Sequence, residues 1–243
     1  MERITFEEMW VKLEKYLKVD NALEQGFSNG KFTKVLASRA KHVVGIDIDP
    51  NFMKIATENL KEYNNVELFL MNAKKTTFKD KEFDVLLNTS FHEFDLSHGT
   101  FSMNLELKKE ILTEMIRLSD TIIFIEPTEN ALTNELFKVF DPSENHGYRI
   151  GKSNELIREF MNDNNYELIE TGLTYNDDKF RSQEELEEEM LDWWADIKVP
   201  ANEKEKKAMI AQIDAILEKA GVLKDLHVIE ELRYNVYKRK SEI

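Results

Sequence analysis

The chain has 243 residues, a length that fits one large domain or a domain with a sizeable insertion. Its 42% hydrophobic and 10% aromatic residues are typical of a folded globular protein and exclude an intrinsically disordered one. The 47 acidic and 33 basic residues give a net charge of −14. Because a field of that sign repels phosphates, we expect a small-molecule substrate and no nucleic-acid partner.

The absence of cysteine excludes disulfides, thiolate metal sites and cysteine nucleophiles. No apolar run is long enough to span a membrane, and the segment Met1–Ile4 carries charges where a signal peptide would be apolar. These features predict a soluble, cytoplasmic protein without a membrane partner. The five histidines have no spacing typical of a metal site, so we expect no metal, and we expect His146 at the surface.

Helical and strand patterns alternate through the first half of the chain. Apolar residues at helical spacing predict a leading helix, and the β-branched run that ends at Asp47 predicts a buried strand. Asp49 and Pro50 are the cap and the first residue of a further helix. In chain order, the sequence predicts a helix over 6–17, a strand over 21–25, a helix over 31–40, a strand over 41–47, a helix that opens at Pro50, and strands over 66–71 and 83–88.

The second half continues the alternation until a purely helical stretch interrupts it. The sequence predicts a helix over 105–118, a strand over 121–125, helices over 130–140 and 153–163, and strands over 167–174 and 227–238. Between the last two strands, residues 182–220 carry two helical patterns and no strand pattern. We interpret this stretch as a helical insertion.

This order of elements predicts an α/β fold. Only crossover helices can join parallel strands and cover them, so we expect a doubly wound, mostly parallel, seven-stranded sheet. Residues 1–181 and 221–243 would form a Rossmann-like cofactor-binding domain, and the insertion over 182–220 would form a substrate cap.

The first strand-to-helix turn is the place where such sheets bind ligands. Glycine is rare in this chain, yet Gly26 and Gly30 both lie in this turn, where they permit a sharp bend and a close approach of ligand to backbone. Glu24 precedes the turn. A carboxylate there would repel a pyrophosphate and attract an ammonium group.

The second strand ends at Asp47, whose carboxylate can accept hydrogen bonds from a ribose diol. Glu24 and Asp47 therefore bracket a ligand that has an amine at one end and a ribose at the other. S-adenosylmethionine fits that description.

The chain thus resembles the class I S-adenosylmethionine-dependent methyltransferases. Their acid-x-Gly-x-Gly-x-Gly motif is matched by Glu24, Gly26 and Gly30, with Ser28 in place of the middle glycine. Asp47 matches the ribose-binding acid of the family. The resemblance covers about residues 20 to 175 and the last strand.

The resemblance also implies roles for residues that follow the later strands. Ile48 would pack on the adenine, and Asn72 with Ala73 would face it, although Asn72 stands where the family usually has aspartate. Asn88 and the loop after it would line the cofactor and the substrate. In that loop, His92 and Glu93 are the catalytic candidates, because an imidazole there can take a proton from the acceptor or simply pack against the cofactor.

The function implied is methyl transfer from S-adenosylmethionine to a small-molecule acceptor. One alternative is a nicotinamide-dependent oxidoreductase, although the turn lacks the second glycine of the dinucleotide fingerprint. Another is a catalytically inactive S-adenosylmethionine-binding protein, which the substitutions at Ser28 and Asn72 motivate.

Overall fold

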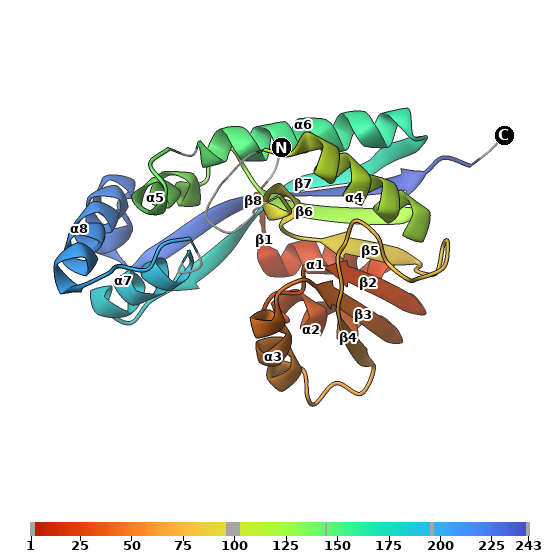
Figure 1. Ribbon diagram of the computed structural model, residues 1–243, viewed down its shortest axis with the longest axis horizontal. Helices are drawn as coiled ribbons and strands as arrows, with labels where there is room; N and C mark the ends of the chain where they lie inside the picture. Colours follow the sequence, from red (N-terminus) through yellow and green to blue (C-terminus); the bar gives the residue numbers. More distant parts are fainter. Residues whose placement is uncertain (1–2, 96–102, 144, 195–196, 242–243) are drawn as a thin grey trace.

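The computed structural model describes residues 3–95, 103–143, 145–194 and 197–241. One eight-stranded sheet crosses the molecule in the order β1-β7-β8-β6-β5-β2-β3-β4 (Figure 1). The strands are β1 (Arg3–Thr5), β2 (Asn21–Gln25), β3 (His42–Asp47), β4 (Val66–Leu70), β5 (Val85–Asn88), β6 (Thr121–Pro127), β7 (Tyr166–Lys179) and β8 (His227–Arg239). The doubly wound α/β fold is confirmed.

The sheet is parallel in its middle and antiparallel only around β8. Strands β2 to β6 pair in parallel, and β1 pairs in parallel with β7. Strand β8 is antiparallel to both β6 and β7. The helices are α1 (Phe6–Leu17), α2 (Lys31–Ala37), α3 (Pro50–Asn59), α4 (Leu105–Leu118), α5 (Leu132–Phe140), α6 (His146–Asp163), α7 (Gln183–Asp192) and α8 (Glu203–Ala220), with short 3₁₀ turns η1 (Phe91–Glu93) and η2 (Val222–Lys224).

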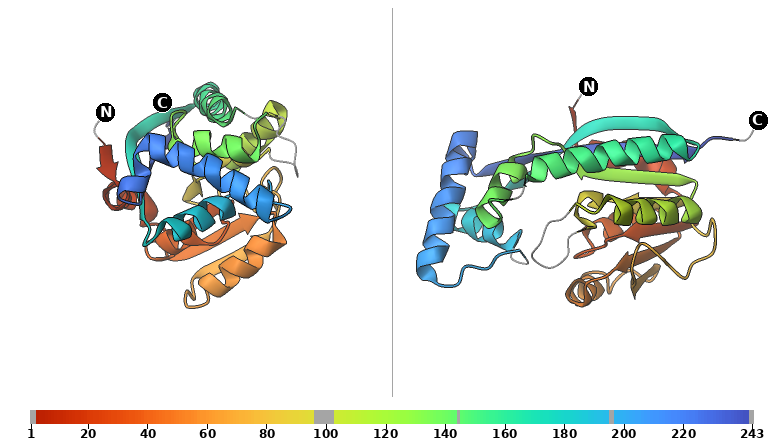
Figure 2. Two further views of the ribbon diagram at one scale, coloured as in Figure 1. Left: turned by 90° about the vertical axis from the view of Figure 1, so that its left-hand side faces the viewer. Right: turned by 45° about the horizontal axis from the view of Figure 1, so that its top comes forward.

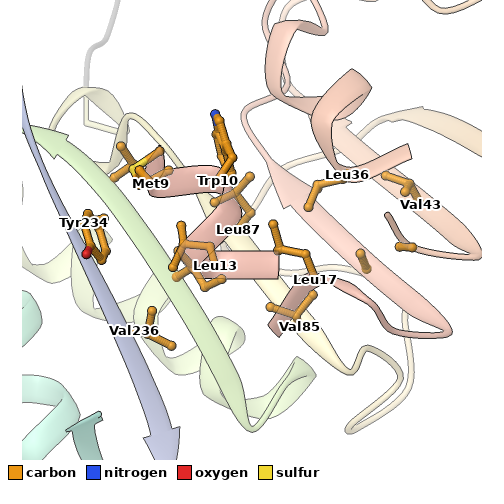
Figure 3. Packing of buried hydrophobic residues seen from close by; sticks show 14 of the residues in the cluster. Met9, Trp10, Leu13, Leu17, Leu36, Val43, Val85, Leu87, Tyr234 and Val236 are labelled. Atoms are coloured by element: carbon orange, nitrogen blue, oxygen red, sulfur yellow. The ribbon is translucent and has the colours of Figure 1, made fainter. Parts of the chain in front are cut away.

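Successive side chains along the middle strands point to opposite faces of the sheet and belong to two apolar cores. On one face, Leu13 and Leu17 of α1 pack against Val85 and Leu87 of β5 (Figure 3). On the other face, α4 and α6 cover the sheet, and Leu86 of β5 belongs to the same apolar cluster as the buried residues of both helices. The continuous burial of the middle strands explains their unbroken apolar sequences, because both faces are covered.

Helices α5, α7 and α8 gather into a separate lobe beyond the main sheet, around the far ends of the long strands β7 and β8 (Figure 2). This lobe has its own apolar core, which includes Phe137 of α5, Met190 of α7 and Ile213 of α8. Helix α5 therefore joins the two helices of the 182–220 insertion, although it precedes them in the chain by about forty residues.

Several elements differ from the sequence-based expectation. Strand β1 is an eighth strand, too short for its pattern to predict it. Helix α6 begins at His146 rather than near residue 153, and strand β7 runs on to Lys179. The antiparallel pair β7–β8 extends beyond the apolar pattern of its sequence, and residues at its far end, such as Val228, pack in the core of the lobe. Within the described residues, no helix is both long and apolar enough to cross a membrane.

The topology brings the predicted site residues to one edge of the sheet. Strands β5, β2, β3 and β4 are neighbours and parallel, so their carboxyl ends meet at the same edge. The glycine turn follows β2, Asp47 ends β3, Asn72 follows β4 and Asn88 ends β5. This is the edge at which open α/β sheets bind ligands.

Candidate functional site

The turn after β2 has the tight backbone that its glycines predict. Gly26, Ser28 and Gly30 all have positive φ, of 79°, 47° and 83°. A Cβ atom on Gly26 would lie 3.0 Å from the ring of Phe94 and 3.5 Å from Ser90 Oγ. Glycine is therefore required at residue 26, both by conformation and by the closeness of the loop that follows β5.

Glu24 lies beneath this turn rather than on its surface. Its side chain is fully buried, and Thr33 Oγ1 of α2 donates a hydrogen bond to Glu24 Oε2 at 2.5 Å. Among the described residues, Glu24 Oε1 has no hydrogen-bond partner. Burial raises the pKa of Glu24 to about 8, against the lowering effect of Thr33, and the charge of Asp47 adds to the rise. Because β2 and β3 are parallel neighbours, both carboxylates lie near the same edge of the sheet.

Asp47 lies at the end of β3, where its carboxylate contacts the backbone of the glycine turn that follows β2. Its Oδ2 accepts a hydrogen bond from the backbone N–H of Ser28 at 2.9 Å, and its Oδ1 accepts one from Asp49 N–H at 2.9 Å. Ile48, which follows, is 67% exposed. An exposed apolar side chain next to a carboxylate can pack against the flat face of a ring-containing ligand.

The remaining cofactor candidates lie along the same edge. Asn72 is exposed after β4, and its Oδ1 accepts a hydrogen bond from Lys74 N–H, while Ala73 is half-buried. Asn88 is fully buried; its Nδ2 donates to the Gln25 carbonyl at 3.3 Å and its Oδ1 accepts from Ser90 N–H at 3.2 Å. Asn88 therefore ties the end of β5 to the glycine strand.

His92 lies in the 3₁₀ turn η1, which Glu126 of β6 holds in place. The Glu126 carboxylate accepts hydrogen bonds from the backbone N–H groups of Phe91 at 2.6 Å and His92 at 3.2 Å. It also lies 2.6 Å from His92 Nδ1. Burial would lower the pKa of His92, but the Glu126 carboxylate outweighs burial, so the pKa is raised. The second ring nitrogen, Nε2, is left on the side of Glu93, 3.7 Å from its Oε1.

A buried charged cluster holds the other side of η1. Lys108 Nζ of α4 donates to the carbonyls of Phe91 and His92 at 2.7 and 3.0 Å. Asp95 forms ion pairs with Lys108 at 3.0 Å and with Arg149 of α6 at 2.8 Å. The backbone of this short turn is therefore fixed through both its N–H and its carbonyl groups.

Next to η1 is a cavity of about 210 Å³ between the sheet and the helical lobe. It is lined by Thr89, Ser90, His92, Glu93, Pro127, Thr133, His146, Trp193, Trp194 and Glu230. Because Ser90 also approaches Gly26, the cavity adjoins the glycine turn.

His146 is a wall of this cavity, so the expectation of a surface histidine was wrong. Its ring stacks on Phe137 at 4.3 Å between centroids and meets the ring of His92 edge-on at 5.2 Å. Only 3% of it is exposed, and burial, followed by the charges of His92 and Arg149, lowers its pKa to about 3. His146 is therefore a neutral imidazole at physiological pH.

Glu230 of β8 faces the same cavity and accepts a hydrogen bond from Thr133 Oγ1 at 2.8 Å. Burial raises the pKa of Glu230, against the lowering effects of Thr133 and His92. Sequence reasoning did not identify Glu126 and Glu230, and it placed His146 at the surface. Only the placement of Glu126 at a strand end was a signal, because the other two reach the cavity from elements that are distant in the chain.

Comparison with known proteins agrees with this arrangement. The family model of the methyltransferase domain matches residues 22–109, which include the turn, Asp47 and η1. A ribosomal RNA small subunit methyltransferase A from Clostridium botulinum (strain Okra / Type B1) is 41% identical over 63 residues, which are 26% of this chain and 23% of the relative. The chain thus matches about a quarter of the length of that relative.

Two solved structures resemble the whole chain. A Bacillus halodurans protein assigned as a methyltransferase superposes with a TM-score of 0.64 at 15% identity, over 96% of this chain and 98% of the other. A Pyrococcus horikoshii protein assigned as an RNA methyltransferase has a TM-score of 0.55 at 10% identity, over 97% and 84%. Both share the fold.

These relatives correct the expectation about partners. The net negative charge led us to exclude nucleic acid and to expect a small-molecule substrate, but the curated relatives act on ribosomal RNA. Overall charge does not report the local charge at a binding site. Residues 22–109 nevertheless match the family model of a methyltransferase domain, and the chain as a whole has the fold of the Rossmann-like methyltransferases.

Proposed function

We propose that the protein transfers the methyl group of S-adenosylmethionine to an oxygen or nitrogen atom of a ring-sized group that occupies the cavity beside η1. The observation that carries this proposal is the placement of His92. A buried network orients its imidazole toward a cavity that adjoins the glycine turn. The volume, about 210 Å³, compares with the roughly 150 Å³ of a protein cavity that takes up benzene.

The cofactor would lie along the carboxyl ends of the parallel strands. Glu24 would hold the methionine amine, Asp47 the ribose diol, and Ile48, Asn72 and Ala73 the adenine. The backbone of Gly26, Ser28 and Gly30 would follow the methionine portion, and Asn88 would keep β5 in register with β2. The positive φ values of the turn support this, because they direct backbone rather than side chains toward the ligand.

The reaction is an in-line displacement at the methyl carbon. The acceptor atom would bond to that carbon and lose its proton to solvent, while the carbon–sulfur bond pair returns to sulfur, which leaves neutral S-adenosylhomocysteine. Because the sulfonium is already activated, much of the rate would come from holding the two reactants in line. His92 and Glu93 would act on the acceptor, since they lie on the cavity side of the turn.

The lobe formed by α5, α7 and α8 would act as the cap over the acceptor. Trp193 and Trp194 follow α7 and line the cavity, and Thr133 belongs to α5. A cap of this kind excludes water from the site and selects the acceptor.

Isothermal titration with S-adenosylmethionine, S-adenosylhomocysteine and NAD tests the cofactor. We expect both sulfur ligands to bind, NAD not to bind, and Asp47→Ala to weaken the binding of the sulfur ligands at least tenfold. Transfer of labelled methyl from the cofactor to RNA and to low-molecular-mass fractions of a cell extract then identifies the acceptor. Binding without transfer to any fraction would instead support an inactive S-adenosylmethionine-binding protein.

A further inference from the structure

Two histidines and a carboxylate converge in the lining of the cavity. One ligand-type atom from each of His92, Glu93 and His146 lies within 4.8 Å of the others. His92 Nε2 is 3.7 Å from Glu93 Oε1. The three residues come from η1 and from the first turn of α6, which are about fifty residues apart in the chain. For this reason the sequence spacing did not predict a metal site.

The two imidazoles are oriented in the way that metal ligands are. His92 Nδ1 is 2.6 Å from the Glu126 carboxylate, which leaves Nε2 for the cavity. A carboxylate bound to the second nitrogen of a histidine is the usual partner of a metal-ligating imidazole, since it fixes the ring and increases its basicity.

His146 supplies an independent observation. Its ring is held by stacking on Phe137 and is almost completely buried. Within the described part of the chain, its Nδ1 has no hydrogen-bond partner. A buried polar atom without a partner costs about 1–3 kcal/mol, so a ring that carries such an atom and has a ligand-type atom near another imidazole and a carboxylate requires an explanation.

We propose that His92, Glu93 and His146 form a binding site for a divalent transition-metal ion such as Zn²⁺, Co²⁺ or Mn²⁺. Two imidazole nitrogens and one carboxylate oxygen are a ligand set that these ions accept. Bond lengths of about 2.0–2.2 Å place neighbouring ligand atoms roughly 3–4 Å apart, so small movements of the three side chains close the site.

Three protein ligands leave a coordination position open toward the cavity. Under the proposed methyl transfer, on which this role rests, the open position takes an acceptor hydroxyl and lowers its pKa. The hydroxyl proton passes to solvent, the oxygen lone pair bonds to the methyl carbon, and the carbon–sulfur pair returns to sulfur. Oxygen acceptors are therefore favoured over uncharged amines.

Titration of the metal-free protein with CoCl₂, without cofactor, tests the site itself. We expect one Co²⁺ per chain, with visible absorption bands that ZnCl₂ removes. Glu93→Gln and His146→Phe should each weaken Co²⁺ binding at least tenfold, because each removes one ligand. Phenylalanine retains the stacking on Phe137, and the half-exposed Glu93 can be replaced without disturbing the core.

The matched control is His227→Gln. His227 also lies beside a carboxylate, that of Asp177, but at the far end of the antiparallel β7–β8 pair, outside the cavity lining. This variant should bind Co²⁺ as the unchanged protein does. Binding that survives both Glu93→Gln and His146→Phe, or that is lost in His227→Gln, overturns the proposal, as does the absence of stoichiometric binding.

The readouts separate this inference from the proposed function. Metal binding without methyl transfer would support the site and count against the proposed reaction. Methyl transfer can also be measured with chelator-treated, metal-free protein and with Glu93→Gln. If neither changes its rate, the result would support the reaction and refute the role of the metal.

Discussion

Glu24 links the pH dependence of folding to cofactor binding, and Glu24→Gln tests both. Because burial raises the pKa of Glu24 from 4.5 to about 8, the folded protein keeps a proton that the unfolded chain releases. The folded state binds more protons between these two pKa values, so its stability falls as the pH rises from about 4.5 to about 8. At about 1.4 kcal/mol for each pH unit, the loss amounts to about 5 kcal/mol.

Urea unfolding at pH values from 5 to 9 measures this loss. Glutamine can still accept the hydrogen bond from Thr33 Oγ1 but does not ionise. The free energy of unfolding of the unchanged protein, relative to that of Glu24→Gln, should therefore decrease by several kcal/mol across this range and level off above pH 8.

Glu114→Gln is the matched control, because Glu114 is a second buried carboxyl with the opposite shift. Burial would raise its pKa, but hydrogen bonds from Arg117 and Thr76 outweigh burial and lower it. The stability that ionised Glu114 contributes is lost only as the pH falls below its ordinary pKa of 4.5. The effect of Glu114→Gln should thus be constant between pH 5 and 9. Parallel stability profiles for the unchanged protein and Glu24→Gln would refute the reasoning about Glu24.

Cofactor binding should release the proton that Glu24 holds. At pH 7 the carboxyl is mostly protonated, whereas a methionine ammonium beside it would favour the carboxylate. Titration of S-adenosylmethionine at pH 7 in buffers of different ionisation enthalpy should show the release of nearly one proton per bound ligand. In Glu24→Gln, binding of S-adenosylmethionine should release no proton from residue 24. If both proteins release the same number of protons per bound ligand, the assignment of Glu24 to the amine is contradicted.

Further substitutions test the turn and the network around η1. Gly26→Ala should destabilise the protein by about 1–3 kcal/mol in thermal unfolding. The alanine would have to adopt the positive φ of residue 26, and its Cβ would lie only 3.0 Å from the ring of Phe94. Glu126→Gln should lower methyl transfer at least tenfold while the affinity for S-adenosylhomocysteine stays within twofold, because it loosens His92 and leaves the cofactor edge intact. Lys108→Met should cost about 3–5 kcal/mol in urea unfolding, because it removes one partner of a buried ion pair.

The sheet could be predicted because its strands carry unambiguous patterns. Strands buried on both faces have continuous apolar sequences, and each is followed by a helix with one apolar stripe. Asp49 caps α3 with a hydrogen bond to Asn51 N–H, as its position before Pro50 predicts. Strand β1 could not be predicted, because three residues are too few to establish an alternation and the pairing with β7 supplies its stability.

The cofactor edge was also accessible to sequence reasoning, because its residues follow directly from strand order. Glu24, Asp47, Asn72 and Asn88 each lie at or just beyond the carboxyl end of one of four adjacent strands. The acceptor cavity was not accessible in this way. His146 comes from α6, Trp194 from the segment after α7 and Glu230 from β8, and only the packing of the lobe against the sheet brings them near His92.

The energetics of η1 argue that its charges serve function more than folding. Lys108, Asp95, Arg149 and Glu126 are all nearly or completely buried, and removing such groups from water costs several kcal/mol for each ion. An apolar core of similar volume would be as stable or more so. What the charges provide instead is a fixed orientation of η1, because they form hydrogen bonds with both the N–H and the carbonyl groups of this short turn. The result is a fixed imidazole at the cavity, which is the property that transfer chemistry and metal binding both require.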